Sequence, residues 1–504
     1  MGPKKAGCAL ACAMPFVVGC GPKDGAVVPG GTEPTTEVVV SDVTLADWSL
    51  SQQAIQPTFD TSRVWYAAAA GATEEVTATP TDPLASVELV VRDLDGVELD
   101  RFASNSAEIA LEGGEQIVAV VTSADGNATG EYTLTPLPSD FPALDVWNAG
   151  EPVPGWFFLC NTDFGPLVDG GGMYLMIVDS LGIPRWLRRQ EGLTFDFRPG
   201  PGGALTWVDS PEFEDRAAIV RRPGGELESW EPFDGGLNTH EFQLLENGNA
   251  LMVADRLEDQ DLTPWGGPAS KPVVDQAIQE VTPSGELVDE WSTKGNIDLA
   301  DMAPPMRSWL LPGIEPAHVN SVDIDPADGN WVISMRTVSQ VRKVDRTTGE
   351  TLWILGGSGS DFTFVDDARL DGWSGFSSQH SARVTGPNTV MVFDNSFVIF
   401  TGFTGDTRMV EYLLDHDAMT ATIIRSWDLV GAEGTPVGGS VQRTPDDHTV
   451  IGFGTLEDVG GALPPAIVEL DENHEPVFEL RLPEGHWSYR VFKYDHDGEA
   501  WILP

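Results

Sequence analysis

The sequence predicts an all-β protein, a six-bladed β-propeller preceded by a small β-sandwich domain. Three observations lead to this prediction. The chain has 504 residues, and its 54 Gly and 37 Pro favour many turns over long helices. Short apolar strands separated by turns fill residues 38–137. A pair of hairpins then recurs along residues 141–504.

Residues 1–20 are expected to be a lipoprotein signal peptide and not part of the fold. Two lysines precede an apolar run, residues 6–18, which is too short to span a bilayer. The run leads into "VVGC", which resembles a bacterial lipobox in which Cys20 becomes lipidated. Plain secretion with cleavage nearby is the alternative. Residues 21–37, rich in Gly, Pro and Thr, are expected to form a flexible tether.

Such an export signal predicts a lipoprotein anchored to the bacterial cell envelope, at the outer membrane or the periplasmic face. If Cys20 is lipidated, Cys160 is the other cysteine of the mature chain, and no intramolecular disulfide can form. We therefore expect Cys160, in "WFFLCN", to be a buried and inert thiol.

The charge balance argues against several kinds of partner. With 78 acidic and 29 basic residues the formal net charge is −49. Such a chain repels nucleic acid and anionic membrane surfaces, so neither is expected to bind it directly. A solvated acidic surface is the favoured interpretation, ahead of a cation-binding role. The sequence is compatible with a homodimer.

The segment 38–137 reads as short strands such as "SVELVVRD" and "QIVAVVTS", a spacing typical of a β-sandwich. It resembles the cadherin-like β-sandwich modules of bacterial surface proteins, chiefly in "PTFDTSRVWYAAA" and "VTSADGNATGEYTLTP". The segment contains no grouping of candidate catalytic or ligand-binding residues, so we expect it to act as a spacer or a docking module.

Residues 141–504 alternate two kinds of hairpin. One is an apolar strand, a Gly or Asp turn and a strand ending in Trp, as in "MYLMIVDSLGIPRW" and "QVRKVDRTTGETLW". The other has a polar turn, as in "HEFQLLENGNALMVA" and "HVNSVDIDPADGNWVIS". Two hairpins give four strands, and six such units fit the segment. Repeated four-stranded units that bury their faces against one another predict propeller blades.

Three histidines fall at one place in this repeat. When the second hairpins are aligned on their turns, His240, His318 and His380 begin the first strand, where other copies have Gly439 and Thr194. Equivalent positions in successive blades surround the propeller axis, so the three histidines are expected to meet at one mouth of the channel. A single histidine is more often structural than catalytic, but three at equivalent positions indicate a site.

An arginine indicates what the site binds. Arg336 lies on the return strand of the His318 hairpin and can point towards the histidines. Three histidines could bind zinc, but a fixed cation beside a metal is unfavourable, whereas beside an anionic substrate it is favourable. The sequence thus predicts an oxyanion site without a metal or another cofactor.

At these residues the chain resembles a known family. The motifs "HEFQLLENGN", "HVNSVDIDPADGNWVISMRT", "FSSQHSARV", "FDNS" and "GSVQRTPDD" are similar to those of the bacterial arylsulfate sulfotransferases, which need no nucleotide sulfate donor. The likeness covers about residues 150–500 and implies a six-bladed propeller. It also implies that His380 is the transiently sulfated residue. The partners it implies around the sulfuryl group are His240, His318, Arg336 and the substrate-binding Asn320.

The resemblance implies transfer of a sulfuryl group from an aryl sulfate ester to a phenolic acceptor, in two steps through a sulfohistidine. The unperturbed pKa of histidine is about 6.5, so at neutral pH a neutral imidazole can attack sulfur without a separate base. Arg336 would hold the sulfuryl oxygens, and His240 or His318 would protonate the departing phenolate. The sequence leaves open which of the two does so.

A non-catalytic propeller lipoprotein, acting as a binding or assembly scaffold, is the alternative function. The unit "KVDRTTGETLW" also occurs in quinoprotein-like scaffold propellers, so the repeat alone does not decide, whereas a scaffold has no need of the histidines.

Two features of the loops lead to further expectations. Some enterobacterial members of the family carry a disulfide shortly before the nucleophilic histidine, but residues 357–379 contain no Cys, which puts the order of this loop in question. Long inserts between strands carry aromatic residues that form either a wall for a phenol ring or ordinary loop packing. These residues are Trp265, Trp309, Phe362 and Trp373.

Overall fold

The computed structural model describes residues 41–162, 171–211, 215–302, 314–369, 374–398, 402–428, 434–455 and 465–495. The expected signal peptide, with Cys20, and the tether lie outside these ranges. Within them the regular secondary structure is almost entirely strand, and helical structure is restricted to the short 3-10 turns Pro201–Gly203, Thr263–Trp265 and Leu299–Asp301. None of the described helices has the length and hydropathy needed to cross a membrane.

Residues 45–137 form two sheets around one core, and their strands pair antiparallel except for one parallel pair, residues 65–69 with residues 133–137. The first has the order β1-β3-β6, from β1 (Leu45–Leu50), β3 (Thr73–Pro80) and β6 (Ser106–Ala110). The second has the order β2-β8-β7-β4-β5, from β2 (Trp65–Ala69), β4 (Ser86–Asp93), β5 (Glu98–Phe102), β7 (Glu115–Thr122) and β8 (Thr129–Leu137). Alternate residues of the strands point inwards, and Trp48 meets Tyr66 edge-on with ring centroids 5.9 Å apart. This is the two-layer packing of a β-sandwich.

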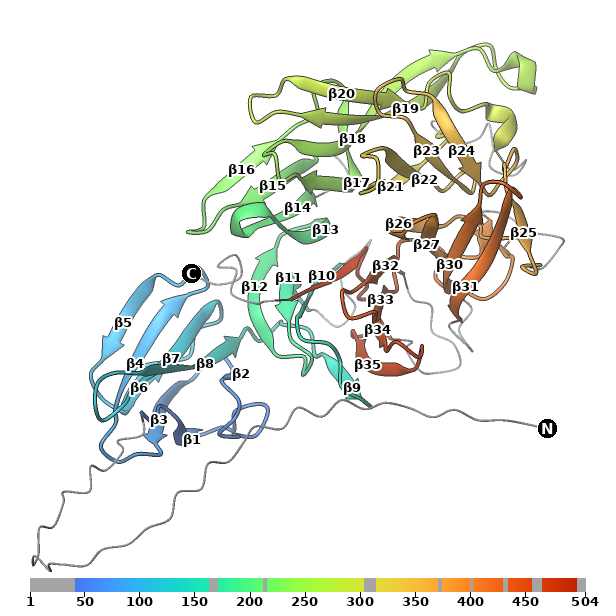
Figure 1. The fold of residues 1–504 in the computed structure, drawn as a ribbon. Coiled ribbons are helices and arrows are strands. Elements are labelled where there is room, and N and C mark those ends of the chain that lie inside the picture. The colour runs from blue at the N-terminus through green and yellow to red at the C-terminus, as the bar shows by residue number, and fades with distance from the viewer. Residues whose placement is uncertain are drawn as a thin grey trace, which may run out of the picture. The chain divides into compact units, whose positions relative to one another are not determined.

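The remaining strands form the blades of a propeller (Figure 1). Blade 1 contains β10 (Trp156–Asn161), β11 (Met173–Val178), β12 (Pro184–Gln190) and β36 (Val491–Tyr494). Blade 2 contains β13 (Leu193–Gly200), β14 (Ala204–Ser210), β15 (Ala217–Arg221) and β16 (Leu227–Trp230). Blade 3 contains β17 (Gly236–Leu244), β18 (Ala250–Gln260), β19 (Lys271–Val281) and β20 (Leu287–Ser292).

The other three blades follow the same order along the chain. Blade 4 contains β21 (Val319–Ile324), β22 (Trp331–Met335), β23 (Gln340–Val344) and β24 (Thr351–Leu355). Blade 5 contains β26 (His380–Gly386), β27 (Thr389–Asp394), β30 (Arg408–Asp415) and β31 (Thr420–Asp428), with β25 (Thr363–Val365) at its outer edge. Blade 6 contains β32 (Ser440–Arg443), β33 (Thr449–Gly452), β34 (Ile467–Leu470), β35 (Pro476–Arg481) and β9 (Asp145–Asn148). A small sheet, β28 (Phe397–Val398) with β29 (Gly402–Phe403), lies between β27 and β30 in the chain. The described strands thus form the six blades that the repeats predict.

The ring of blades is closed twice. The last strand, β36, pairs with β10 as the innermost strand of blade 1, so the C-terminal part of the chain completes the first blade. The early strand β9 pairs with β35 at the outer edge of blade 6. Each end of the propeller segment thus contributes a strand to the blade at the other end, and backbone hydrogen bonds within these two blades hold both ends in the ring.

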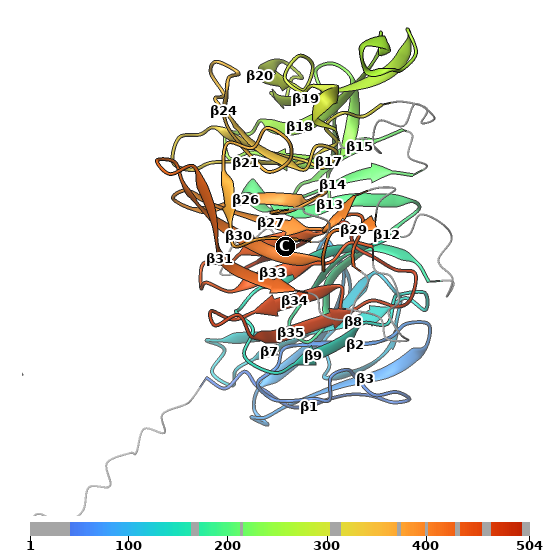
Figure 2. The ribbon, with the colours of Figure 1, turned by 90° about the vertical axis from the view of Figure 1, so that its right-hand side faces the viewer.

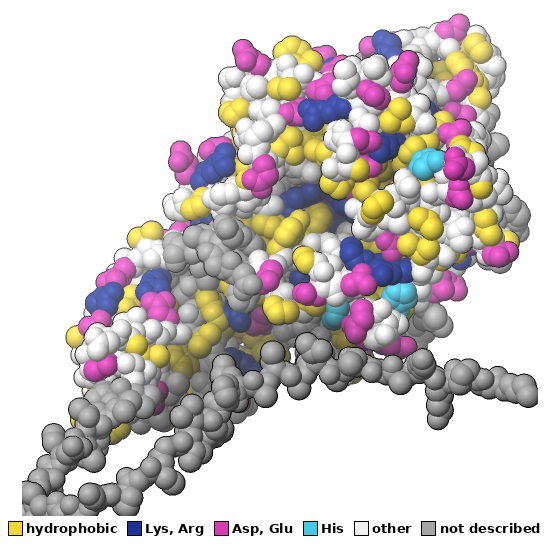
Figure 3. Space-filling model, viewed as in Figure 1, with side chains coloured by type: hydrophobic (Ala, Val, Ile, Leu, Met, Phe, Trp, Pro, Cys, Tyr) yellow, Lys and Arg dark blue, Asp and Glu magenta, His cyan; other side chains and the backbone are white. Residues whose placement is uncertain are grey.

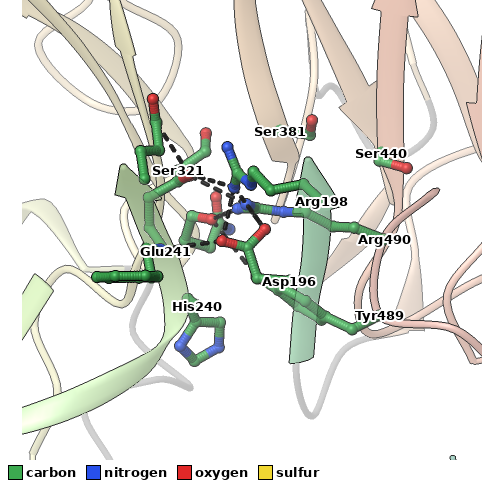
Figure 4. Close-up of polar contacts among 12 residues, drawn as sticks. Asp196, Arg198, His240, Glu241, Ser321, Ser381, Ser440, Tyr489 and Arg490 are labelled. Atoms are coloured by element: carbon green, nitrogen blue, oxygen red, sulfur yellow. Dashed lines mark hydrogen bonds and ion pairs between the residues drawn. The ribbon is translucent and has the colours of Figure 1, made fainter. Parts of the chain in front are cut away.

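The inner strands β13, β17, β21 and β26 lie side by side around the centre in both ribbon views (Figures 1 and 2). A ring of hydrogen bonds joins these strands and the inner strands β32 and β36. One side-chain oxygen of an inner strand accepts the backbone N–H of the next inner strand, and Figure 4 shows the accepting side chains of Asp196, Glu241, Ser321, Ser381 and Ser440. The pairs are Asp196 with Phe242 (2.9 Å), Glu241 with Val322 (3.1 Å), Ser321 with Ala382 (3.0 Å), Ser381 with Val441 (3.4 Å) and Ser440 with Val491 (2.9 Å).

Arg490 closes this axial ring at the sixth position. Its Nη1 donates to Asp196 Oδ1 at 2.7 Å and lies 3.0 Å from Glu241 Oε2. Arg198 adds a second cation, 2.5 Å from both Asp196 Oδ1 and Glu241 Oε1. The six ring members are at most 1% exposed. The two buried carboxylates are therefore compensated by two guanidinium groups, as buried charges must be.

We expect Ser440→Ala to lower the free energy of unfolding by about 1–3 kcal/mol, because the buried Val491 N–H would lose its acceptor. The reference is Ser229→Ala on the exposed edge strand β16, which should stay within about 0.5 kcal/mol of the parent. Urea unfolding monitored by tryptophan fluorescence measures both. Equal stabilities of the two variants would show that the axial ring does not contribute to the closure of the propeller.

Candidate active site

The histidines and the arginine predicted from the sequence gather around the propeller axis. His240 lies on β17, His380 begins β26, His318 precedes β21, and Arg336 follows β22. The rings of His240 and His318 meet edge-on with centroids 4.6 Å apart. Tyr489 stands against two of them, with its ring centroid 5.5 Å from that of His240 and 6.3 Å from that of His380. The backbone N–H of Arg336 donates to the carbonyl of His318 at 3.0 Å, which brings the arginine to the same group.

The structure corrects the alignment of these residues. The residue before each ring member lies at one level of the axis, and these residues are Phe195, His240, Asn320, His380, Gly439 and Tyr489. In blade 4 the equivalent of His240 is therefore Asn320, and His318 lies two residues earlier, in a left-handed conformation with φ 54°. In blade 2 the equivalent is Phe195 and not Thr194. The turn "DPADGN" of blade 4 is longer than "ENGN" of blade 3, so alignment on the turns hid this offset.

A fixed amide orients His380. His380 Nδ1 lies 2.7 Å from Asn395 Oδ1. Both N–H groups of the Asn395 amide are already used, by the carbonyls of Thr435 at 2.6 Å and Gly438 at 2.9 Å. The amide oxygen must therefore accept, so Nδ1 of His380 carries the proton and Nε2 carries a lone pair. This Nε2 is buried and has no hydrogen-bond partner in the described part of the chain.

His240 has the same kind of partner. Its Nδ1 lies 2.6 Å from Asn238 Oδ1, and the Asn238 amide donates to the two oxygens of Asp255 at 2.9 and 3.0 Å. The proton of a neutral His240 is thus also on Nδ1. Burial lowers the pKa of His240 well below its usual value, and the nearby His318 and His380 lower it further.

His318 differs because a carboxylate stands behind it. Its Nδ1 lies 2.8 Å from Glu315 Oε2. The other oxygen of Glu315 accepts the amide of Gln276 at 3.0 Å. Burial acts to raise the pKa of Glu315, but His318 and Arg336 outweigh it and hold that pKa below the usual range. A carboxylate thus faces Nδ1 of His318, whereas side-chain amides face Nδ1 of His240 and His380.

Arg336 and Asn320 add polar groups without full sets of partners. Arg336 is 8% exposed; its Nη2 donates to the Pro436 carbonyl at 3.3 Å, and its Nε is buried without a hydrogen bond. Burial lowers the pKa of Arg336, yet a guanidinium remains charged in proteins. The Asn320 amide donates to the Gln379 carbonyl at 2.7 Å, and its oxygen has no partner among the described residues. A fixed positive charge beside unsatisfied polar atoms suits an oxyanion.

Burial lowers the pKa of His380 well below its usual value, and Arg336 contributes the next largest effect in the same direction. The ring is therefore neutral at neutral pH, and Arg336 is close enough to affect its charge state. This is the protonation state that a nucleophilic imidazole needs.

A buried ionic cluster holds the chain on both sides of His380. Arg408 binds Asp367 through two N···O contacts of 3.0 and 2.9 Å and binds Asp394 through Nε at 2.9 Å. Asp394 Oδ1 in turn accepts the backbone N–H of Ser377 at 3.0 Å and of Ser396 at 2.8 Å. Ser377 lies three residues before His380, and Ser396 follows Asn395. The cluster thus orders the described part of the loop that lacks a disulfide.

The sequence reading missed several residues of the site. Asn395 lies in "FDNS" and Asn238 two residues before His240, but neither was given a role. Glu315 precedes His318 by three residues, a spacing without a strong signal of its own. Tyr489 and Arg490 lie in the last hairpin, "YRVFKYDHDGEAWIL", where no sequence motif marks them as site residues.

The expectations for the loop aromatics have mixed outcomes. Phe362 is 3% exposed and packs edge-on against Trp353, so it is a core residue and not part of a pocket wall. Trp265 packs at the border of another core cluster. Trp309 and Trp373 lie outside the described residues.

Other groups in the described part have structural roles. Cys160 is buried, its Sγ lies 3.2 Å from the Thr194 carbonyl, and burial raises the pKa of its thiol to about 11. No group of three or more His, Cys, Asp or Glu among the described residues is arranged to hold a metal ion.

Acidic side chains are spread over the face shown in Figure 3, where Lys and Arg side chains appear in the hollow at the centre.

Comparisons with known proteins bear on the family. Residues 157–490 match the family model described as arylsulfotransferase (ASST). No curated protein matches the chain.

Three solved structures share low similarity with the chain. A protein of unknown function from Bacteroides caccae is 14% identical, with a TM-score of 0.41, over 68% of this chain and 99% of its own. Virginiamycin B lyase from Staphylococcus aureus is 11% identical, with a TM-score of 0.32, over 87% of this chain and 100% of its own. The periplasmic gluconolactonase of Pseudomonas aeruginosa is 10% identical, with a TM-score of 0.37, over 68% of this chain and 99% of its own. The family match is therefore the finding that bears on function.

The lowered pKa values predict a loss of stability in acid. In the unfolded chain a histidine takes up a proton below about pH 6.5, but the folded protein keeps His240 and His380 neutral to a lower pH. Stability should therefore be complete above that pH and fall as pH decreases, by up to about 1.4 kcal/mol per pH unit for each histidine. Urea unfolding of the parent and of His380→Asn, at several pH values, tests this. The variant should lose less stability on acidification, and parallel curves would contradict the assignment.

Proposed function

This chain belongs to the arylsulfotransferase family, and from that premise we propose that it moves a sulfuryl group from an aryl sulfate ester to a phenolic acceptor through a sulfated His380. The observation that carries the proposal is the state of the His380 ring. Its Nδ1 donates to Asn395, and its Nε2 carries a lone pair without a hydrogen-bond partner in the described part of the chain. The charge of Arg336 acts on the same ring.

In the first half-reaction, His380 Nε2 forms a bond to sulfur while the bond between sulfur and the aryl oxygen breaks. Arg336 balances the charge on the sulfuryl oxygens, and Asn320 offers them a polar side chain. Sulfuryl transfer resembles phosphoryl transfer, in which positioning and electrostatic stabilisation supply most of the rate enhancement.

His318 is the residue suited to protonate the departing phenolate. Glu315 stabilises a protonated His318, whereas His240 rests on a neutral amide and has a strongly lowered pKa. The leaving oxygen thus takes its proton from His318, and the bonding pair of the S–O bond goes to that oxygen. His240 stays neutral and offers its Nε2 as a hydrogen-bond acceptor. The carboxylate behind its ring favours His318 over His240, the alternative that the sequence left open.

The second half-reaction runs the same steps backwards with the acceptor. The acceptor phenol gives its proton to His318, its oxygen bonds to sulfur, and the bond between sulfur and Nε2 breaks. One set of residues serves donor and acceptor in turn, so double-reciprocal plots should be parallel. A non-catalytic scaffold would have no use for three oriented histidines and a buried arginine.

We also propose that the mature protein is a lipoprotein anchored in the cell envelope through Cys20. The support comes from the sequence, in which a short apolar run leads into "VVGC" and a Gly- and Pro-rich stretch follows. A lipidated cysteine that carries several acyl chains would anchor stably.

The covalent intermediate can be observed directly. We expect the parent, mixed with phenyl sulfate without an acceptor, to gain the mass of one sulfuryl group, and peptide mapping should place it on His380. His380→Asn should gain none and should release no phenol, because its side chain offers no nucleophilic nitrogen. Sulfation of another residue in the parent would remove His380 from this role.

The assignment of His318 predicts a dependence on the leaving group. Glu315→Gln should slow transfer from phenyl sulfate, whose phenol has a pKa near about 10, by roughly a hundredfold. Transfer from 4-nitrophenyl sulfate should slow far less, because the more acidic nitrophenolate needs little protonation. Glu258→Gln makes the same chemical change at the surface and serves as the control. Equal losses with both donors would show that Glu315 does not act through a general acid.

A further inference from the structure

The three histidines of the site differ in what stands behind their Nδ1 atoms. His380 and His240 each face a side-chain amide, of Asn395 and Asn238. His318 faces the carboxylate of Glu315. The difference matters for His380, because the charge of its ring changes during the reaction.

Attack through Nε2 leaves a positive charge on the ring. A neutral His380 keeps its proton on Nδ1, so after the bond to sulfur forms, the ring is an imidazolium that carries a sulfuryl group. A carboxylate at Nδ1 would stabilise that cation through a charge-assisted hydrogen bond, which is roughly twice as strong as a neutral one. An amide offers only a neutral hydrogen bond. In a buried site this difference is larger than in water.

We propose that Asn395 is a positioning residue whose neutral amide keeps the sulfated His380 reactive. The proposal rests on the function proposed above. The amide holds the proton on Nδ1, so the group that leaves sulfur in the second half-reaction is a neutral imidazole, with the bonding pair returning to Nε2. Because no anion stabilises the sulfated ring, the sulfuryl group passes to the acceptor and does not remain on the enzyme.

The surroundings of Asn395 hold the amide in this orientation. Rotation of the amide by half a turn would direct N–H groups at His380 Nδ1 and an oxygen at two carbonyls, those of Thr435 and Gly438. Asn395 is fully buried, so water cannot supply other partners. Its neighbours in sequence, Asp394 and Ser396, are joined by a hydrogen bond within the Arg408 cluster. The amide is thus locked from both sides.

The contrast with His318 supports the same interpretation. That residue must hold a positive charge before it gives up a proton, and it has Glu315 behind it. The nucleophile must not be stabilised in its charged, sulfated form, and it has an amide. The partner at Nδ1 thus matches the charge that each ring needs.

Asn395→Asp tests the proposal, since it introduces the stabilising charge at nearly the same shape. The two half-reactions are measured separately: sulfation by phenyl sulfate without an acceptor, and loss of the sulfuryl group after addition of phenol, both by rapid-quench intact mass. We expect sulfation at a rate no lower than that of the parent, and loss slowed roughly tenfold or more. Asn105→Asp, at an exposed position of the sandwich, adds the same charge away from the site and should match the parent.

The outcomes separate the two proposals. If the parent never gains a sulfuryl group, the proposed function fails, whatever the variant does. If the parent is sulfated and Asn395→Asp slows both half-reactions equally, or neither, then Asn395 acts only in packing and the inference is wrong.

A measurement on the parent covers the case in which the variant does not fold. Nitrogen-15 NMR of histidine-labelled protein, with His380→Asn used to assign the signal, reports the tautomer of His380. The proposal requires a proton on Nδ1 and none on Nε2, and the opposite tautomer would overturn it.

Discussion

The axial ring of hydrogen bonds is the interaction on which the site depends. Each inner strand has a buried N–H next to the axis that its own sheet does not satisfy, and a side chain of the preceding blade accepts it. Meeting this requirement fixes the relative height of neighbouring strands. The residue before each ring member then falls at one level, which brings His240, Asn320 and His380 together. The same ring recruits Arg490, beside the C-terminal strand, to neutralise its two carboxylates.

The chemistry of the site is set by pairs of residues and not by the histidines alone. An amide or a carboxylate behind each ring decides which nitrogen carries the proton and whether the ring can hold a charge. The Arg408 cluster fixes the described part of the loop before His380 through ionic contacts and hydrogen bonds, without a covalent link. Such a cluster needs no oxidising enzyme to form.

The sequence predicted the features that local patterns encode. Blades follow from hairpins that repeat along the chain, and His240, His318, His380 and Arg336 could be found because they recur with the hairpins or lie beside them. What it could not predict depends on contacts between distant segments. The side-chain amide of Asn395 is oriented by two backbone carbonyls about forty residues away in the sequence, those of Thr435 and Gly438. The two-residue offset of His318 follows from packing between blades, which alignment of turns does not detect, and Phe362 lies in a core that the loop's composition did not reveal.

The buried axial ring closes the central channel of the propeller on one side of the histidines. Asp196, Glu241 and Arg490 are at most 1% exposed, so this layer of side chains excludes water from the propeller axis next to the histidines. We therefore expect a substrate to reach His380, and a product to leave it, from the side of the histidines opposite the axial ring. In the proposed reaction, the phenol released from the donor would have to leave before the acceptor binds, and a large product that dissociates slowly would inhibit the next turnover.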